Sequence, residues 1–492
     1  MEKCVPLLQG VWPEFRPKML EAVLGYIQEG WKVLARSNDD LRGIANDRLI
    51  PSSPVVYVSR SENFGDIKKS LKLSLASSPV ELRQLPKDGN VTQHGLLYLP
   101  HSYVVPGGRF NEMFGWDSYF IVRGLLLAGE IEMAQNMVDN HLYQIANYGK
   151  VLNANRTYYL TRSQPPFLSR MVLELFEYTR DVKWLKSAFI LLEEYLQFWN
   201  KTPHLVESTG LSRYFDEGSG PAPEVMAGEV QHYDRVRELL QSLGTYGEYV
   251  GADGKLTELF YQADRSMRES GFDPSHRFGP ANAECLNINP VCLNSLLYRM
   301  EEDLSLIADL CALQSKMSDY IDRAQKRKRS MNTYLWDSSY GLYRDFNVKL
   351  GSWSKYRFLT EAYPLWAGIP DKRQVNRIDT NLAVFEQAGG LVTSLSQTGC
   401  QWDYPFGWAP LQMIAVEGLR SYGLNEKADR IAAKFVATVI KEFDRTSQIF
   451  EKYDVSRTTS VVDLKLGYTS NEVGFGWTNA AVLSLLHGMG RQ

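Results

Sequence analysis

Residues 106–120 read PGGRFNEMFGWDSYF, and this stretch predicts a tight loop, a helix start and a ligand site in one place. Its glycines let the backbone turn sharply and approach a ligand closely. Arg109 offers a planar set of donors, and Trp116 offers an apolar face beside the two acceptors of Asp117. A sugar presents apolar faces with polar edges, so the stretch suits a sugar. The alternative is a glycine loop leading into an aromatic-rich core helix, because aromatic clusters usually belong to a core.

A second stretch, QWDYPFGWAP at residues 401–410, repeats the Trp-Asp pair beside aromatic residues, proline and glycine. Together the two stretches resemble the paired signatures of the trehalase family of glycoside hydrolases, PGGRFxExxxWDxY and QWDxPxGWxP. Every fixed position of both signatures is met, and the resemblance extends from about residue 95 to the end. It implies an inverting glycoside hydrolase with an all-α fold, a closed (α/α) toroid of six helical hairpins.

Composition excludes several other classes of protein. The chain has 492 residues, 44% hydrophobic and 23% charged, with a net charge of −3 and no basic cluster for nucleic acid or a membrane surface. Neither a signal-peptide core nor a run of about 18 apolar residues occurs. The five cysteines are scattered without a CxxC pair, so we expect a soluble protein in a reducing, cytoplasmic compartment.

The rest of the pattern predicts helices in consecutive pairs with minor strand content. RPKMLEAVLGYIQEGWKVLA, residues 16–35, has helical spacing, whereas residues 50–93 are irregular. Beyond them, short turns alternate with long polar, aromatic or Pro/Gly loops. Paired helices with short connections pack antiparallel, so a closed ring would gather the long loops at one mouth. We expect one catalytic domain over residues 1–492, with about residues 1–95 forming an N-terminal helix and an irregular arm.

Asp273 is the candidate general acid, in the stretch RESGFDPSHRF. From the sequence alone, a turn aspartate before proline would be the favoured interpretation, because that role is common. The stretch is similar to ESGWDxSxR of trehalases, and the resemblance implies that this aspartate protonates the leaving oxygen. An apolar neighbour such as Phe272 would help to keep the carboxyl protonated near neutral pH.

Glu451 is the candidate general base, in the stretch QIFEKYDV. Without the resemblance, an ordinary charged strand or turn would be the favoured interpretation. Trehalases carry EKYDV here, and the resemblance implies that this glutamate activates the attacking water. Inversion needs two carboxyl groups far enough apart to admit that water.

The remaining candidates resemble the lining of sugar subsites. The predicted substrate-binding residues are Arg109, Phe110, Phe114, Trp116, Asp117, Asn153, Arg162, Gln164, Glu224, Trp402 and Asp403. For Arg109 and Arg162 the alternative is an ion pair that braces a loop, and both roles can hold together. No metal or cofactor is implied, since calcium-loop, HExxH and phosphate-loop patterns do not occur.

Two departures from trehalases bear on the substrate. GSGPAPEV places Ala222 where those enzymes carry an arginine for the second sugar, and VVDLKLGYTSNEVGFGW replaces their glycine-rich closing segment, with Glu472 as its nearest carboxylate. Other stretches look more like the mannosylglycerate and glucosylglycerate hydrolases of the wider superfamily. Arg277 and the tyrosines of NANRTYYLTR are candidates for binding a glycerate carboxylate.

Four functions are therefore weighed. We expect hydrolysis of mannosylglycerate, and of glucosylglycerate as a related substrate, with α,α-trehalase as the alternative. A sugar epimerase would need two histidines as an acid/base pair, and among the matched loops only the one with His276 contains a histidine. A catalytically dead sugar-binding protein would not need both Asp273 and Glu451. The expected partner is a small-molecule glycoside, and the sequence leaves a homo-oligomer open.

Overall fold

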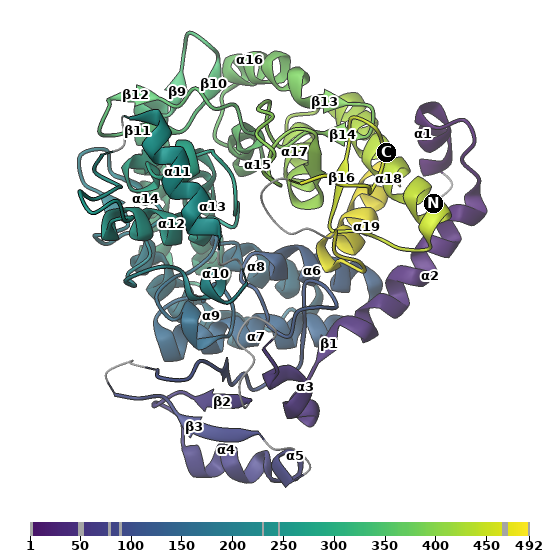
Figure 1. Cartoon of the computed structure of the whole chain (residues 1–492). Coiled ribbons are helices and arrows are strands. Elements are labelled where there is room, and N and C mark those ends of the chain that lie inside the picture. The colour runs from purple at the N-terminus through teal and green to yellow at the C-terminus, as the bar shows by residue number, and fades with distance from the viewer. Residues whose placement is uncertain are drawn as a thin grey trace.

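The structure is a computed structural model that describes residues 3–47, 54–76, 80–87, 91–228, 231–244, 247–464 and 471–490. Figure 1 shows helices arranged around a central axis, with short strands confined to connections and to the N-terminal region. In those ranges, no helix is both long enough and apolar enough to cross a lipid bilayer.

The inner wall of the fold is a closed ring of helices. Within the described residues its members are α6 (Asp117–Ala128), α8 (Leu168–Thr179), α13 (Val291–Leu310), α15 (Tyr363–Ala367), α17 (Ala409–Ser421) and α19 (Gly476–Gly490). Each contacts the next, and α19 contacts α6 to close the ring. These helices are apolar on most sides, as in α17, where every residue from Ala409 to Val416 is buried. Helices of this kind are stable only inside a protein.

An outer layer of helices packs behind this ring. It consists of α7 (Ile131–Tyr148), α9 (Val182–Trp199), α14 (Gln314–Tyr334), α16 (Lys372–Leu382), α18 (Asn425–Thr446) and α2 (Pro17–Leu34). In α9 the buried residues Leu185, Ala188, Phe189, Leu192 and Leu196 follow helical spacing, which leaves the other face polar. The all-α toroid of hairpins is thus confirmed. The ring closes through the two ends of the chain, because α2 packs against α19.

A group of three helices in the described part of the chain lies outside the ring and the outer layer. The helices α10 (Pro223–Gly228), α11 (His232–Leu243) and α12 (Glu258–Glu269) are inserted between α9 and α13. They share a small apolar cluster of their own that includes Leu240 and Phe260. The insertion matters because the end of α12 delivers Asp273 to the mouth of the ring.

The N-terminal region is more regular than expected. Between α1 (Cys4–Val11) and the ring lie α3 (Leu41–Ala45), β2 (Val55–Val58), α4 (Phe64–Ser70), α5 (Lys72–Ala76), β3 (Glu81–Gln84) and β4 (Leu96–Leu97). The strands form a parallel sheet in the order β3-β2-β4. α4 and α5 connect β2 to β3, as a parallel pair requires. This sheet shares a separate apolar cluster with α3, which places the end of α3 beside the ring.

The remaining strands are short connections. They are β1 (Ala35–Arg36), β5 (Tyr103–Val104), β6 (Leu205–Val206), β7 (Leu211–Ser212), β8 (Ile288–Asn289), β9 (Trp336–Asp337), β10 (Leu342–Tyr343), β11 (Phe346–Asn347), β12 (Ser352–Trp353), β13 (Glu386–Gln387), β14 (Gly390–Leu391), β15 (Phe406–Trp408) and β16 (Lys452–Asp454). The antiparallel pair of β15 and β16 positions the site, because Trp408 faces Lys452 in its register. It joins the QWDYPFGW stretch to the EKYDV stretch.

Candidate active site

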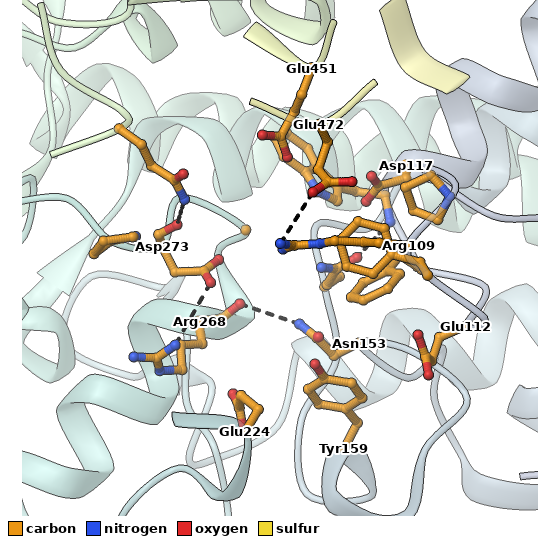
Figure 2. A pocket seen from close by; sticks show the side chains of 18 of the residues that line it. Arg109, Glu112, Asp117, Asn153, Tyr159, Glu224, Arg268, Asp273, Glu451 and Glu472 are labelled. Carbon is orange, nitrogen blue, oxygen red and sulfur yellow. Dashed lines mark hydrogen bonds and ion pairs between the residues drawn. The ribbon is translucent and has the colours of Figure 1, made fainter. Parts of the chain in front are cut away.

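A cavity of about 610 Å³ opens at the end of the ring where α6, α17 and α19 begin. Figure 2 shows acidic, basic and aromatic side chains facing it from different segments of the chain. The predicted site residues that line it are Arg109, Phe110, Phe114, Trp116, Asp117, Asn153, Arg162, Gln164, Glu224, Asp273, Trp402 and Glu451. A cavity of this size can enclose a disaccharide.

Asp273 reaches the cavity from the turn that follows α12. Gly271 makes this turn with φ at +76°, and a Cβ there would lie 2.9 Å from the ring of Trp116. Glycine is therefore required both by the backbone conformation and by the close approach to the indole. The turn fixes the position of Asp273 against the aromatic wall.

The second signature stretch holds the backbone of Asp273. Gln401 Nε2 donates to the carbonyl oxygen of Asp273 at 2.5 Å, and Trp402 Nε1 donates to the same oxygen at 3.2 Å. The carboxyl group itself faces the cavity, with Oδ2 at 3.8 Å from Arg268 Nη1. Burial raises the pKa of Asp273, Arg268 and Arg162 act to lower it, and Glu224 acts to raise it. The net upward shift favours a carboxyl group that can donate a proton.

Glu451 comes from a separate wall, directly before β16. Its side chain is buried, and Oε2 accepts a hydrogen bond from Lys452 Nζ at 2.5 Å. The ammonium of Lys452 also lies over the ring of Trp408, 4.9 Å from the centroid. The backbone N–H of Glu451 donates to the carbonyl of Glu472 at 2.8 Å. The buried carboxylate of Glu451 therefore has a buried ammonium group at hydrogen-bond distance.

Asp117, the first residue of α6, is a third carboxyl group in the same space. Burial, reinforced by the charges of Glu451 and Asp273, holds its pKa well above the usual range. Asp117 is therefore close enough to both Glu451 and Asp273 to be affected by their charges, as a group of the same site is.

Within the described part of the chain, three arginines line the cavity, and each has carboxylate partners. Arg109 Nη1 lies 3.4 Å from Glu472 Oε1. Arg162 is paired with Glu224 and, at 3.5 Å, with Asp216. Arg268 is paired with Asp264 at 3.1 Å as well as with Asp273. For Arg109 and Arg162, the bracing ion pairs considered in the sequence are present, and both guanidinium groups still face the cavity.

Indole rings form an apolar wall beside the carboxyl groups. Trp402 stacks on Trp408 with centroids 3.8 Å apart, and Trp116 and Trp477 approach these rings edge-on or tilted. Such rings offer a flat surface for the apolar face of a sugar while the surrounding polar groups contact its hydroxyls. The arrangement can therefore hold a sugar ring between a proton donor and a proton acceptor.

Asp403 is the predicted site residue that does not line the cavity. Its carboxylate is fully buried and accepts hydrogen bonds from Tyr356 Oη at 2.5 Å, from Ser394 Oγ at 2.8 Å and from the hydroxyl of Thr398. It braces the loop that carries Trp402.

Two other residues considered in the sequence also point elsewhere. Arg277, the arginine suggested for glycerate, is fully buried and forms a two-pronged pair with Asp345 at 2.8 and 2.9 Å. His276, suggested for epimerase chemistry, accepts a hydrogen bond from the backbone N–H of Ala281. Neither lines the cavity.

Several lining residues were not singled out from the sequence. They are Asn46, Asp47, Glu112, His232, Arg268, Gln401, Trp408 and Trp477, with Lys452 directly behind Glu451. The sequence did contain a signal for Arg268, since this arginine opens the stretch RESGFDPSHRF, five residues before Asp273. Glu472, noted as the nearest carboxylate to the altered closing segment, lines the cavity; residues 465–470 of that segment lie outside the described residues.

Comparisons of this chain with known proteins all point to the same family. The trehalase family model matches residues 61–490. The chain is 37% identical over 431 residues to the cytosolic neutral trehalase of Saccharomyces cerevisiae, covering 78% of this chain and 56% of that one. It is 36% identical over 430 residues to that of Emericella nidulans, with 77% and 56% covered. The chain thus spans about half the length of these curated relatives.

Solved structures agree with this match. Neutral trehalase Nth1 from Saccharomyces cerevisiae superposes with a TM-score of 0.82 at 32% identity, covering 96% of this chain and 94% of that chain. A mannosylglycerate hydrolase from Thermus thermophilus reaches a TM-score of 0.56 at 19% identity, covering 78% and 95%, which shows a shared fold alone. The expectation of a cytoplasmic protein agrees with the names of the two relatives, which are both called cytosolic.

The expected glycosylglycerate substrate is wrong. The similar proteins are named trehalases, whereas the likeness to the mannosylglycerate hydrolase is distant. The cavity gives the physical reason. Among the residues that the structure describes, seven carboxyl groups and three arginines line it, and each of these arginines has a carboxylate partner. An anionic glycerate would meet an acidic wall without an uncommitted arginine. Arg268 of α12 lines the cavity, whereas Ala222 does not.

Proposed function

The chain belongs to the trehalase family of glycoside hydrolases, and we propose that it hydrolyses α,α-trehalose to two molecules of glucose with inversion at the attacked carbon. The observation that carries the proposal is the placement of Asp273 and Glu451 on separate walls of one disaccharide-sized cavity. We further propose that the reaction takes place in the cytoplasm and that the substrate is a neutral sugar.

In this mechanism Glu451 is the general base. Its carboxylate removes a proton from a water molecule, whose oxygen attacks the anomeric carbon of one glucose. Lys452 stabilises the charge of Glu451 before the transfer, and the indole wall holds the sugar ring. The new carbon–oxygen bond forms on the face opposite the bond that breaks, which inverts the configuration.

Asp273 is the general acid. Its carboxyl group donates a proton to the oxygen that joins the two sugars as the bond to the anomeric carbon breaks, so that the second glucose leaves as a neutral alcohol. Because the leaving group departs on the side away from Glu451, the second glucose lies toward Arg268, Glu224 and Tyr159 in Figure 2. Arg268 there provides donors for its hydroxyls.

A comparison of substrates tests the proposal. Reducing sugar should be released from trehalose, with kcat/KM at least about 100-fold higher than for mannosylglycerate or glucosylglycerate, because an acidic site leaves the glycerate carboxylate unpaired. Added D-glycerate should not compete with trehalose. A glycosylglycerate that is a better substrate than trehalose would contradict the proposal.

The pH dependence of kcat/KM should report the pKa of Asp273, the general acid. Catalysis needs Asp273 protonated, so kcat/KM should fall as the pH rises through its pKa, which burial places above the ordinary value. Arg268 lowers and Glu224 raises this pKa. The alkaline limb should therefore move to higher pH in Arg268→Gln and to lower pH in Glu224→Gln.

The two variants control for each other. Each removes one charge from the same wall, but Arg268 is positive and Glu224 is negative, so their effects on the pKa of Asp273 should have opposite signs. Steady-state rates on trehalose over a range of pH measure the two limbs. If neither limb moved, or if both moved in the same direction, the group that titrates would not be Asp273 in this environment.

A further inference from the structure

The N-terminal arm contributes residues to the cavity itself. Asn46 and Asp47 follow directly after α3, and both line the same 610 Å³ space as Asp273 and Glu451. They precede residue 61, where the match to the family model begins. The side chain of Asp47 is only 9% exposed, so its carboxylate is part of the wall rather than of the outer surface.

Arg156 fixes this part of the arm. Its guanidinium is fully buried and donates to the carbonyl oxygens of Ala45 at 3.2 Å and Asn46 at 2.9 Å. The same group binds Glu112 Oε1 at 2.6 Å and lies 3.8 Å from Asp47 Oδ2. Carbonyls and carboxylates around one planar guanidinium define a single geometry. Asp47 is thereby tied to Glu112, a residue of the first signature loop.

The same contacts show which end of the cavity the arm closes. Figure 2 shows Glu112 and Tyr159 on the side of the cavity away from Glu451. Arg156 places Asp47 beside Glu112, and Tyr158 of the loop that carries Arg156 also lines this end. This is the side on which the departing sugar lies when Glu451 activates water on the opposite face.

We propose that Asn46 and Asp47 complete the outer wall of the leaving-group subsite, and that the Asp47 carboxylate accepts a hydrogen bond from a hydroxyl of the departing glucose. The inference rests on the proposed function, because it needs a neutral, hydroxyl-rich second sugar. The N-terminal arm then determines which leaving group is accepted, whereas the turn after α12 supplies the acid and the segment before β16 supplies the base. A hydrogen bond to a charged acceptor is among the stronger polar contacts to a ligand.

Two substrates with different leaving groups test the inference. Trehalose fills the leaving-group subsite with a glucose, whereas α-D-glucosyl fluoride places a single atom there. Asp47→Asn should lower kcat/KM for trehalose at least about tenfold, since it replaces a charge-assisted hydrogen bond. It should change kcat/KM for the fluoride less than about twofold. Asn46→Ala, which leaves the backbone carbonyl to Arg156, should reduce the trehalose rate selectively as well.

Asp66→Asn is the matched control, because it removes one carboxylate from an exposed position of α4 in the same N-terminal region. It should leave both substrates unchanged, and the melting temperatures of all variants should be compared. If the wild-type protein hydrolyses trehalose, two results for Asp47→Asn would overturn this inference and leave the proposed function intact. They are an equal loss of kcat/KM on both substrates and no loss on either. A wild-type protein that hydrolyses the fluoride but not trehalose would overturn the proposed function and this inference with it.

Discussion

Replacing Asp273 by asparagine is expected to lower kcat for trehalose by at least about 10²–10⁴-fold, because the departing glucose then has no proton donor. Asparagine has the same shape and can keep the neighbouring hydrogen bonds, since the contacts that fix this residue use its backbone carbonyl. The variant should therefore fold and melt close to the wild-type temperature. Steady-state kinetics and thermal unfolding measure the two quantities separately.

α-D-Glucosyl fluoride identifies the defect as loss of the acid. Fluoride leaves without needing a proton from an enzyme acid, so Asp273→Asn should lose far less activity on it than on trehalose. An equal loss on both substrates would show that Asp273 acts on binding or on the fold. Near-wild-type turnover of trehalose would show that another group donates the proton.

Replacing Glu451 by glutamine should abolish turnover of both substrates to a similar extent, again by at least about 10²–10⁴-fold. Every substrate needs an activated water, whatever its leaving group, and an amide cannot take the proton. The contrast with Asp273→Asn separates the base from the acid within one experiment. Substantial activity of Glu451→Gln on the fluoride would contradict the assignment of the base.

A control must separate the loss of activity in Glu451→Gln from a loss of stability. Glu451→Gln leaves Lys452 buried without its carboxylate, and breaking a buried pair costs about 3–5 kcal/mol. The double variant Glu451→Gln, Lys452→Met removes both charges and should regain much of the lost melting temperature. It should remain inactive. If the double variant regained activity along with stability, the loss in Glu451→Gln would have been one of folding.

The sequence predicted the helical hairpins and both carboxyl groups proposed for catalysis, together with part of the cavity wall, because both signatures and both reactive stretches are local patterns. Asp117 and Asp403 show the limit of such patterns. Each follows a tryptophan in a similar stretch, yet Asp117 faces the cavity and Asp403 is enclosed by the hydroxyl groups of Tyr356 and Ser394. What a carboxylate contacts depends on the segments packed against it, which the sequence pattern does not contain.

The substrate was predicted wrongly for the same reason. The argument compared one position, Ala222, with an arginine of trehalases and concluded that a guanidinium was lost. In the structure Arg268, from another element, lines the cavity, and the backbone N–H of Ala222 donates to Tyr233 Oη. A ligand is bound by a charged group at a particular point in the cavity, and that group can come from different positions of the backbone. Asp47 illustrates this too, since Arg156 brings it to the cavity from a remote part of the chain.

The fold contains a further long-range pairing that local periodicity could not reveal. The helix over residues 17–34 was expected from its spacing, but its partner is the last helix of the chain, α19. Consecutive hairpins follow from short connections, whereas this pair is brought together only by closure of the ring. The single catalytic domain expected over the whole chain stays a prediction.

The central claim is hydrolysis of α,α-trehalose with inversion, and NMR of the first products tests it most directly. In trehalose both anomeric carbons are α. The glucose that leaves keeps its α configuration, because its own carbon–oxygen bond is not broken, while the attacked glucose becomes β. Fresh product should therefore contain equal amounts of α- and β-glucose before mutarotation. Release of α-glucose alone, or no glucose from trehalose, would contradict the account.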